Sequence, residues 1–157
     1  MPAISVTDRS IVSSRVFDYP RETVFDAWIN PEQLSRWWGP KGFRNTFHKF
    51  DPKAGGQWDF TMHGPDGMNY QNRCVFEEVI KPERIIFTHL QPGHEFEVTA
   101  TFQKVLEGRC KLIFEMLFTS KDECDLVRSF VLEANEENFD RLEQVLNSTA
   151  KHIGINQ

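Results

Sequence analysis

The stretch SKDECDLVRSFVLEANEENFDRLEQVLNS, residues 120–148, decides the fold class of this chain. Ser120 is followed three residues later by Glu123, a capping-box pattern in which the two side chains satisfy free N–H groups at the start of a helix. About 28 helical residues would span on the order of 40 Å, which is enough to cross a whole domain. Apolar residues recur with the helical period and are predicted to share one stripe: Leu126, Val127, Phe130, Val131, Ala134, Phe139, Leu142, Val145 and Leu146.

The residues before this helix are predicted to form strands, because their apolar side chains alternate with a period of two. The alternation is clearest in residues 57–63, 96–103 and 110–118, where every second side chain is large and apolar. Turn segments rich in Gly and Pro separate these runs. Further strands are expected over residues 9–19, 43–50, 69–80 and 85–90.

Two short helices are predicted between the first and the second strand. Pro20 suits the first turn of a helix, because its missing N–H would have no partner there. Asn30 is the expected N-cap of the second helix, with Gln33 as its reciprocal capping-box partner. Gly39 and Pro40 end that helix.

This order of elements predicts an α+β fold. A sheet of about six to seven antiparallel strands needs its apolar face covered, and the last helix is the only element long enough to cover it. We therefore expect a curved sheet wrapped around one long C-terminal helix. The length of 157 residues fits a single domain over residues 1–157, with its core at about 9–148.

Composition excludes several classes of function. The net charge of -5 and the pI near 5.5 provide no field that would attract nucleic acid or an anionic membrane. We expect no signal peptide and no membrane insertion, because neither a basic start nor an apolar run of about 18 residues is present. Cys74, Cys110 and Cys124 are odd in number and widely spaced, which predicts free thiols in a cytoplasmic protein.

Several short motifs are spread along the chain: RVF at 15–17, VFDAW at 24–28, NPE at 30–32, WWGP at 37–40, GPDG at 64–67, PERIIFT at 82–88 and FDRL at 139–142. With these motifs the chain, over roughly residues 9–148, resembles the bacterial proteins related to the C-terminal domain of the Hsp90 ATPase activator, which belong to the START-like (SRPBCC) superfamily. The chain departs from many relatives at Cys74, where they carry glycine, and at residues 134–138, which lack a small, glycine-containing stretch.

The resemblance implies the START-like helix-grip fold, in which the sheet and the long helix enclose a cavity. It implies that the protein binds a small hydrophobic or amphipathic molecule there, without a cofactor. Two alternatives stay open: an interaction or stress-response module that contacts an Hsp90-type chaperone, and an enzyme like the aromatase/cyclase branch of the superfamily. The activator has an additional N-terminal domain, whereas fewer than about ten residues precede the first strand here, which weakens the chaperone alternative. Formation of a homodimer is also left open.

The aromatic content suggests which residues would line such a cavity. Fourteen Phe and four Trp supply bulky apolar surface that must pack in a core or line a pocket. Trp37 and Trp38 are adjacent, so we expect one to anchor the short helices and the other to cap the cavity mouth or lie on the surface. The candidate ligand-binding residues are Trp38, Phe60, Met62, Tyr70, Phe96, Phe114, Met116, Phe118 and Phe130.

Polar candidates for acid–base chemistry are sparse. His63 and His89 fall near strand ends and are expected to be solvated or bonded to the backbone. Neither HExxH, GxSxG nor a Cys/His spacing is present, so we predict no metal site and no catalytic residue. The polar residues that could reach the interior are His48, His63, Tyr70, Asn72, Arg73, His89 and Asn138.

Overall fold

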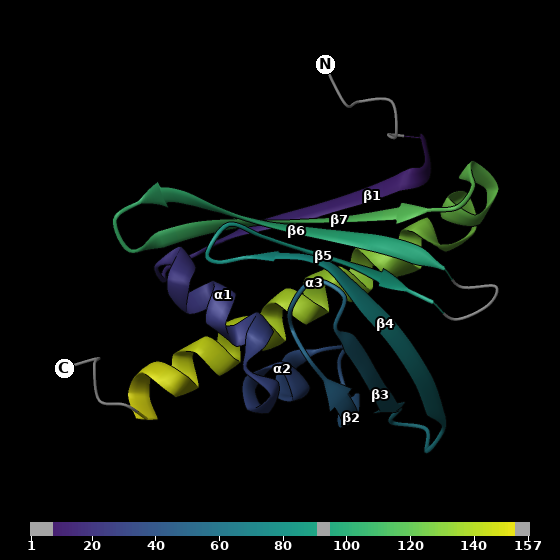
Figure 1. The fold of residues 1–157 in the computed structure, drawn as a ribbon, viewed down its shortest axis with the longest axis horizontal. Coiled ribbons are helices and arrows are strands. Elements are labelled where there is room, and N and C mark those ends of the chain that lie inside the picture. Colours follow the sequence, from purple (N-terminus) through teal and green to yellow (C-terminus); the bar gives the residue numbers. More distant parts are fainter. Residues whose placement is uncertain (1–7, 91–94, 153–157) are drawn as a thin grey trace.

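The computed structural model describes residues 8–90 and 95–152 (Figure 1). Within these residues, seven strands form one antiparallel sheet in the order β1-β7-β6-β5-β4-β3-β2, so the first strand lies beside the last. The elements are β1 (Ser10–Phe17), α1 (Arg21–Ile29), α2 (Pro31–Trp37), β2 (Arg44–Phe50), β3 (Gln57–His63), β4 (Asn69–Ile80), β5 (Arg84–His89), β6 (Phe96–Leu106), β7 (Arg109–Phe118) and α3 (Lys121–His152). The prediction of an α+β helix-grip fold is confirmed.

Bulges in three strands accompany the curvature of the sheet. The register shifts between Phe47 and Lys49 in β2, between Phe76 and Glu78 in β4 and between Lys104 and Leu106 in β6. A bulge leaves one residue unpaired, bends its strand and increases the local twist. Strands β2, β3 and β4 turn away from the other four and form the lower right wall in Figure 1. Cys74 on β4 pairs regularly with Trp58 on β3 and with His89 on β5.

Helix α3 crosses the concave side of the sheet diagonally, with α1 and α2 beside its C-terminal half (Figure 1). The prediction that Leu126 and Phe130 belong to its buried stripe is wrong, since these side chains are 85% and 67% exposed. Leu126 and Phe130 come one position before Val127 and Val131, which pack on the core. One position along an α-helix is a rotation of about 100°, so Leu126 and Phe130 point away from the sheet. The buried positions are Cys124, Asn135, Asn138, Phe139, Leu142, Val145 and Leu146.

Both predicted N-caps form, but among the described residues neither capping box has its reciprocal bond, since the Glu123 side chain accepts from Thr119 Oγ1 instead. The Asn30 side chain accepts from the Gln33 backbone N–H at 3.3 Å. The reciprocal bond from Gln33 is not made, because the Asn30 N–H donates to the Asp26 carbonyl and thereby ends α1. At the start of α3, Ser120 Oγ accepts from the Glu123 N–H at 3.1 Å.

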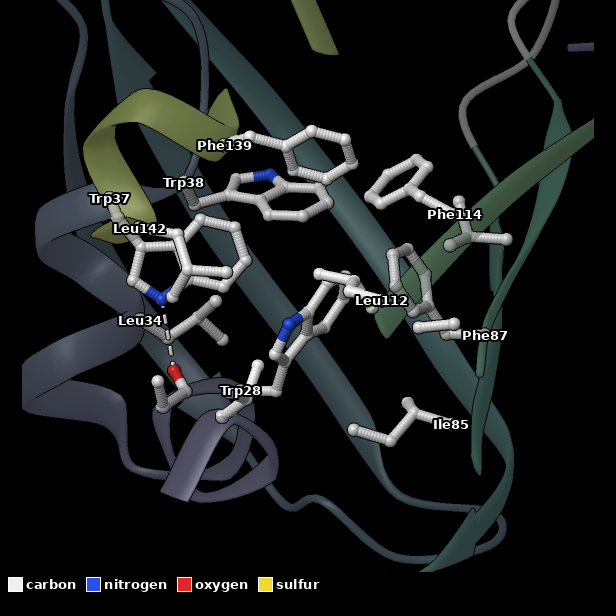
Figure 2. Packing of buried hydrophobic residues seen from close by; sticks show 14 of the residues in the cluster. Trp28, Leu34, Trp37, Trp38, Ile85, Phe87, Leu112, Phe114, Phe139 and Leu142 are labelled. Atoms are coloured by element: carbon white, nitrogen blue, oxygen red, sulfur yellow. Dashed lines mark hydrogen bonds between the residues drawn. The ribbon is translucent and has the colours of Figure 1, made fainter. Parts of the chain in front are cut away.

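Three tryptophans join the short helices to the core (Figure 2). Trp37 and Trp38 are 1% and 9% exposed, so the expectation that only one of them points inward is wrong. Trp37 ends α2, whereas Trp38 has an extended backbone with φ -70° and ψ 133°, which lets both rings turn beneath α3. Trp28 packs against them with ring centroids 5.0 and 5.7 Å away, and Trp37 Nε1 donates to the Ala27 carbonyl at 3.0 Å.

Candidate functional site

A cavity of about 740 Å³ lies between the concave face of the sheet, α3 and the segment that joins α2 to β2. Its volume falls within the range of about 300–1,000 Å³ that is typical of small-molecule sites. Its lining consists of Trp38, Gly39, Pro40, Phe60, Met62, Asn69, Tyr70, Gln71, Asn72, Cys74, Phe87, His89, Phe96, Val98, Phe114, Met116, Phe130, Asn135 and Asn138.

Strand alternation directs most of these side chains into the cavity. Cys74, His89 and Phe96 are direct neighbours across β4, β5 and β6, so they form one row on the concave face. Phe87 and Val98 stand in the next row. Figure 2 shows Trp38, Phe87 and Phe114 pointing toward one another.

The structure places all of the sequence-predicted ligand residues on this cavity except Phe118. Phe118 pairs with Phe96 at the end of β7, and its ring lies 5.7 Å from the Phe96 ring. Phe130 borders the cavity while remaining 67% exposed, so it stands at the opening. Tyr70 is 44% exposed and also borders the opening.

Two polar predictions are corrected by the structure. His89 was expected to be solvated or bonded to the backbone; it is not solvated, since it is only 7% exposed and lines the cavity. The sequence contained the signal, because His89 continues the alternation of Ile85 and Phe87 on β5. His48 and His63 do not line the cavity: they lie on the other face of the sheet, where their rings contact the hydroxyl groups of threonines on neighbouring strands.

The orientation of the His89 ring follows from its partners. Asn72 Nδ2 donates to the Tyr70 carbonyl, so Asn72 Oδ1 faces His89 Nε2 at 2.8 Å and Nε2 carries the proton. The imidazole also stacks on Phe96, with ring centroids 4.8 Å apart and an interplanar angle of 8°. Sequence reasoning did not single out Asn135, whose position on α3 looked like part of a polar surface.

Helix α3 fixes the segment that closes one side of the cavity. Arg141 donates to five backbone carbonyls, those of Arg36, Trp38, Gly39, Pro40 and Phe43, at 2.8–3.2 Å. Asn138 accepts from the Gly39 N–H, and Glu137 accepts from the Lys41 N–H. Burial lowers the pKa of Arg141 from its ordinary value, because removal from water disfavours the charged guanidinium.

The lining carries little reactive chemistry. None of the lining residues is Asp, Glu, Lys or Arg. Burial raises the pKa of the Cys74 thiol, which keeps it protonated and weakly nucleophilic. Among residues 8–90 and 95–152, no group of three or more His, Cys, Asp or Glu side chains could hold a metal ion, and no helix is long and apolar enough to cross a membrane.

Comparison with known proteins gives one family and a shared fold. The family described as Activator of Hsp90 ATPase homolog 1-like protein matches residues 18–147. A protein from Arthrobacter aurescens, 22% identical, has a similar structure with a TM-score of 0.83, over 93% of this chain and 90% of that one. A protein from Nitrosomonas europaea is 19% identical, with a TM-score of 0.83 over 92% and 97%. The AHSA1 protein from Silicibacter pomeroyi is 23% identical, with a TM-score of 0.73 over 89% and 99%. No curated protein matches the chain.

Proposed function

The chain belongs to the Activator of Hsp90 ATPase homolog 1-like family, and on this basis we propose that it binds a small hydrophobic or amphipathic molecule between the sheet and α3. The observation that supports this proposal best is the cavity of about 740 Å³, whose mostly apolar lining is rich in aromatic side chains. Side chains around an unfilled space lack dispersion partners on one side, and an apolar ligand supplies them. The few polar groups on the wall would fix its orientation.

A thermal-melt screen tests this proposal. A ligand at about 100 times its dissociation constant stabilises the folded state by roughly 2.7 kcal/mol. For a domain of this size we expect the melting temperature to rise by roughly 5–10 °C. Native and denaturing mass spectrometry of the purified protein would reveal a molecule that copurifies with it. If a broad screen gives no shift and no molecule is extracted, the binding proposal is wrong.

Contact with an Hsp90-type chaperone is the second candidate. It is supported by the family's description and by the exposed apolar side chains of Leu126 and Phe130 on α3. Stimulation of Hsp90 ATPase activity by the wild type, lost in a Leu126→Ser, Phe130→Ser variant that still melts cooperatively, would favour this candidate. Acid–base catalysis has less support, because among residues 8–90 and 95–152 the cavity wall carries one imidazole, that of His89, and no carboxylate.

A further inference from the structure

Two buried asparagines on α3 face the cavity. Asn135 and Asn138 are 5% and 7% exposed, and both line the cavity wall. They are three positions apart, so their side chains lie on the same side of the helix, about 5–6 Å from one another at Cβ. They fall in the stretch 134–138, which contains no glycine.

The Asn138 amide presents a donor to the cavity. Its Oδ1 accepts from the Gly39 N–H at 2.9 Å. Because a backbone N–H can only donate, the oxygen must face Gly39 and Nδ2 must point away from it. Among the described residues, Asn138 Nδ2 has no hydrogen-bond partner, and protein atoms do not enclose it completely. It is therefore available to a molecule in the cavity.

The Asn135 amide presents an acceptor. Its Nδ2 contacts Ser13 Oγ at 3.1 Å and Met116 Sδ at 3.8 Å. A thioether sulfur can only accept, which fixes Nδ2 on that side and leaves Oδ1 on the other. Oδ1 has no hydrogen-bond partner in residues 8–90 and 95–152 and is not fully enclosed. The helix thus offers one acceptor and one donor side by side.

Among the described residues, Asp59, Arg73 and Arg141 direct their charges away from the cavity. Asp59 precedes Phe60 on β3 and pairs with Arg73, which stands between Asn72 and Cys74 on β4, so the two charged groups lie on the opposite face of the sheet, with Nε and Oδ1 3.6 Å apart. Arg141 is surrounded by backbone carbonyls. An ionised group inside the cavity would lose its hydration without meeting an opposite charge, which is strongly unfavourable.

We infer that the molecule bound in this cavity is uncharged and carries a primary carboxamide, or a group that likewise both donates and accepts, paired with Asn135 Oδ1 and Asn138 Nδ2. Its apolar body packs against the aromatic wall formed by Phe60, Phe87 and Phe114. This inference rests on the proposed function and narrows it to a ligand class. By the same argument, an ionised amphiphile such as a fatty-acid anion should bind more weakly than its uncharged counterpart.

A matched ligand series tests the inference on the wild-type protein. The probes are decane, naphthalene and phenanthrene skeletons, each carrying a carboxamide, a carboxylate or a methyl group, with binding measured by calorimetry. For at least one skeleton, the carboxamide should bind about tenfold or more tightly than the carboxylate. It should also bind roughly 3- to 10-fold more tightly than the methyl compound, the effect of a hydrogen bond to an otherwise unpaired group.

Variants show whether the asparagines cause this preference. Asn138→Leu and Asn135→Leu should reduce carboxamide affinity roughly 3- to 10-fold while leaving the methyl compound bound as tightly or more tightly. Asn147→Leu is the matched control, because it also removes a hydrogen bond of α3, the one from Tyr19, at an exposed site outside the cavity. General damage to the fold would weaken both ligands, so the affinity ratio separates recognition from stability.

The outcomes separate this inference from the proposed function. If no member of the series binds and nothing copurifies with the protein, both are overturned. If a skeleton binds but its carboxylate or methyl form binds as tightly as the carboxamide, the cavity holds ligands and the inference is wrong. It is equally wrong if both leucine variants keep the wild-type preference for the carboxamide.

Discussion

Arg141 Nη1 lies 2.8 Å from the carbonyl oxygen of Gly39, a residue 102 positions earlier in the chain. The same guanidinium reaches three further carbonyls of the segment between α2 and β2, and the Arg36 carbonyl in the last turn of α2. This segment carries Trp38 over the cavity. A single side chain of α3 therefore fixes the backbone from which part of the cavity wall is built.

Replacing Arg141 with alanine should lower stability and disturb the cavity together. Hydrogen bonds to a charged group contribute about 1.5–3 kcal/mol each but are not additive, so we expect a loss of about 2–4 kcal/mol. Lysine should recover only part of it, because an ammonium group lacks the planar, multiple-donor geometry of guanidinium. Urea unfolding measures the effect. Arg36→Ala is the control, because the Arg36 side chain is exposed and Arg141 contacts this residue through its backbone carbonyl. An equal loss of stability in Arg141→Ala and Arg36→Ala would contradict the role assigned to the Arg141 guanidinium.

Removing the indole N–H should have different effects at Trp37 and Trp28. Trp37 Nε1 donates to the Ala27 carbonyl, whereas Trp28 Nε1 is buried without a partner among the described residues. Trp37→Phe leaves a buried carbonyl unpaired, while Trp28→Phe removes a donor that is already unpaired. We expect Trp37→Phe to be less stable than Trp28→Phe by at least about 1 kcal/mol in denaturant unfolding. The reverse order would contradict the hydrogen-bond argument.

Filling the cavity from its floor should reduce ligand binding more than enlarging a residue at its opening. Val98 is fully buried between Phe87 and Met116, whereas Phe130 is largely exposed. Val98→Phe should greatly reduce the ligand-induced rise in melting temperature, at a loss of about 1–3 kcal/mol for overpacking. Phe130→Trp should change that rise much less. Val12→Phe, at a half-exposed position on β1, controls for added size. An unchanged ligand response in Val98→Phe would place the ligand elsewhere.

Buried thiols should make the protein less stable at alkaline pH. Burial raises the pKa of Cys110 to about 11, above its ordinary value of 9.0. The unfolded chain therefore loses the Cys110 proton at a lower pH than the folded chain does. The contribution of Cys110 to the free energy of unfolding is constant below about pH 8 and falls as the pH rises from 9 toward 11. Cys110→Ala should flatten part of this decline. Urea midpoints at pH 8, 9 and 10 test the prediction, and an identical decline in the variant would show that other groups cause it.

The sequence predicted the fold well because its signals were local. Alternation in β3 and β6, the Ser120 cap and the length of α3 each follow from neighbouring residues, and together they leave one way to cover the sheet. The exposure of Leu126 and Phe130 could not be predicted, because a wide apolar stripe does not specify which side contacts the sheet.

The cavity was harder to predict than the fold. Alternation placed Phe60, Phe114 and Met116 on its wall, and the same argument could have placed His89 there. Asn135 and Arg141 depend on contacts with Ser13 and with the segment after α2, far away in sequence. Local pattern carries no information about such partners, so their roles emerge only from the structure.

The pairing of β1 with β7 has a consequence for the protein during its synthesis. Strand β1 leaves the ribosome before the other strands, but β7, the strand it pairs with, follows only about a hundred positions later. Helix α3 emerges after β7. At about 5–20 residues per second, the aromatic face of the nascent sheet stays uncovered for several seconds. Ribosome-bound chains halted before α3 should therefore be more sensitive to proteases and more prone to aggregate than chains released at full length.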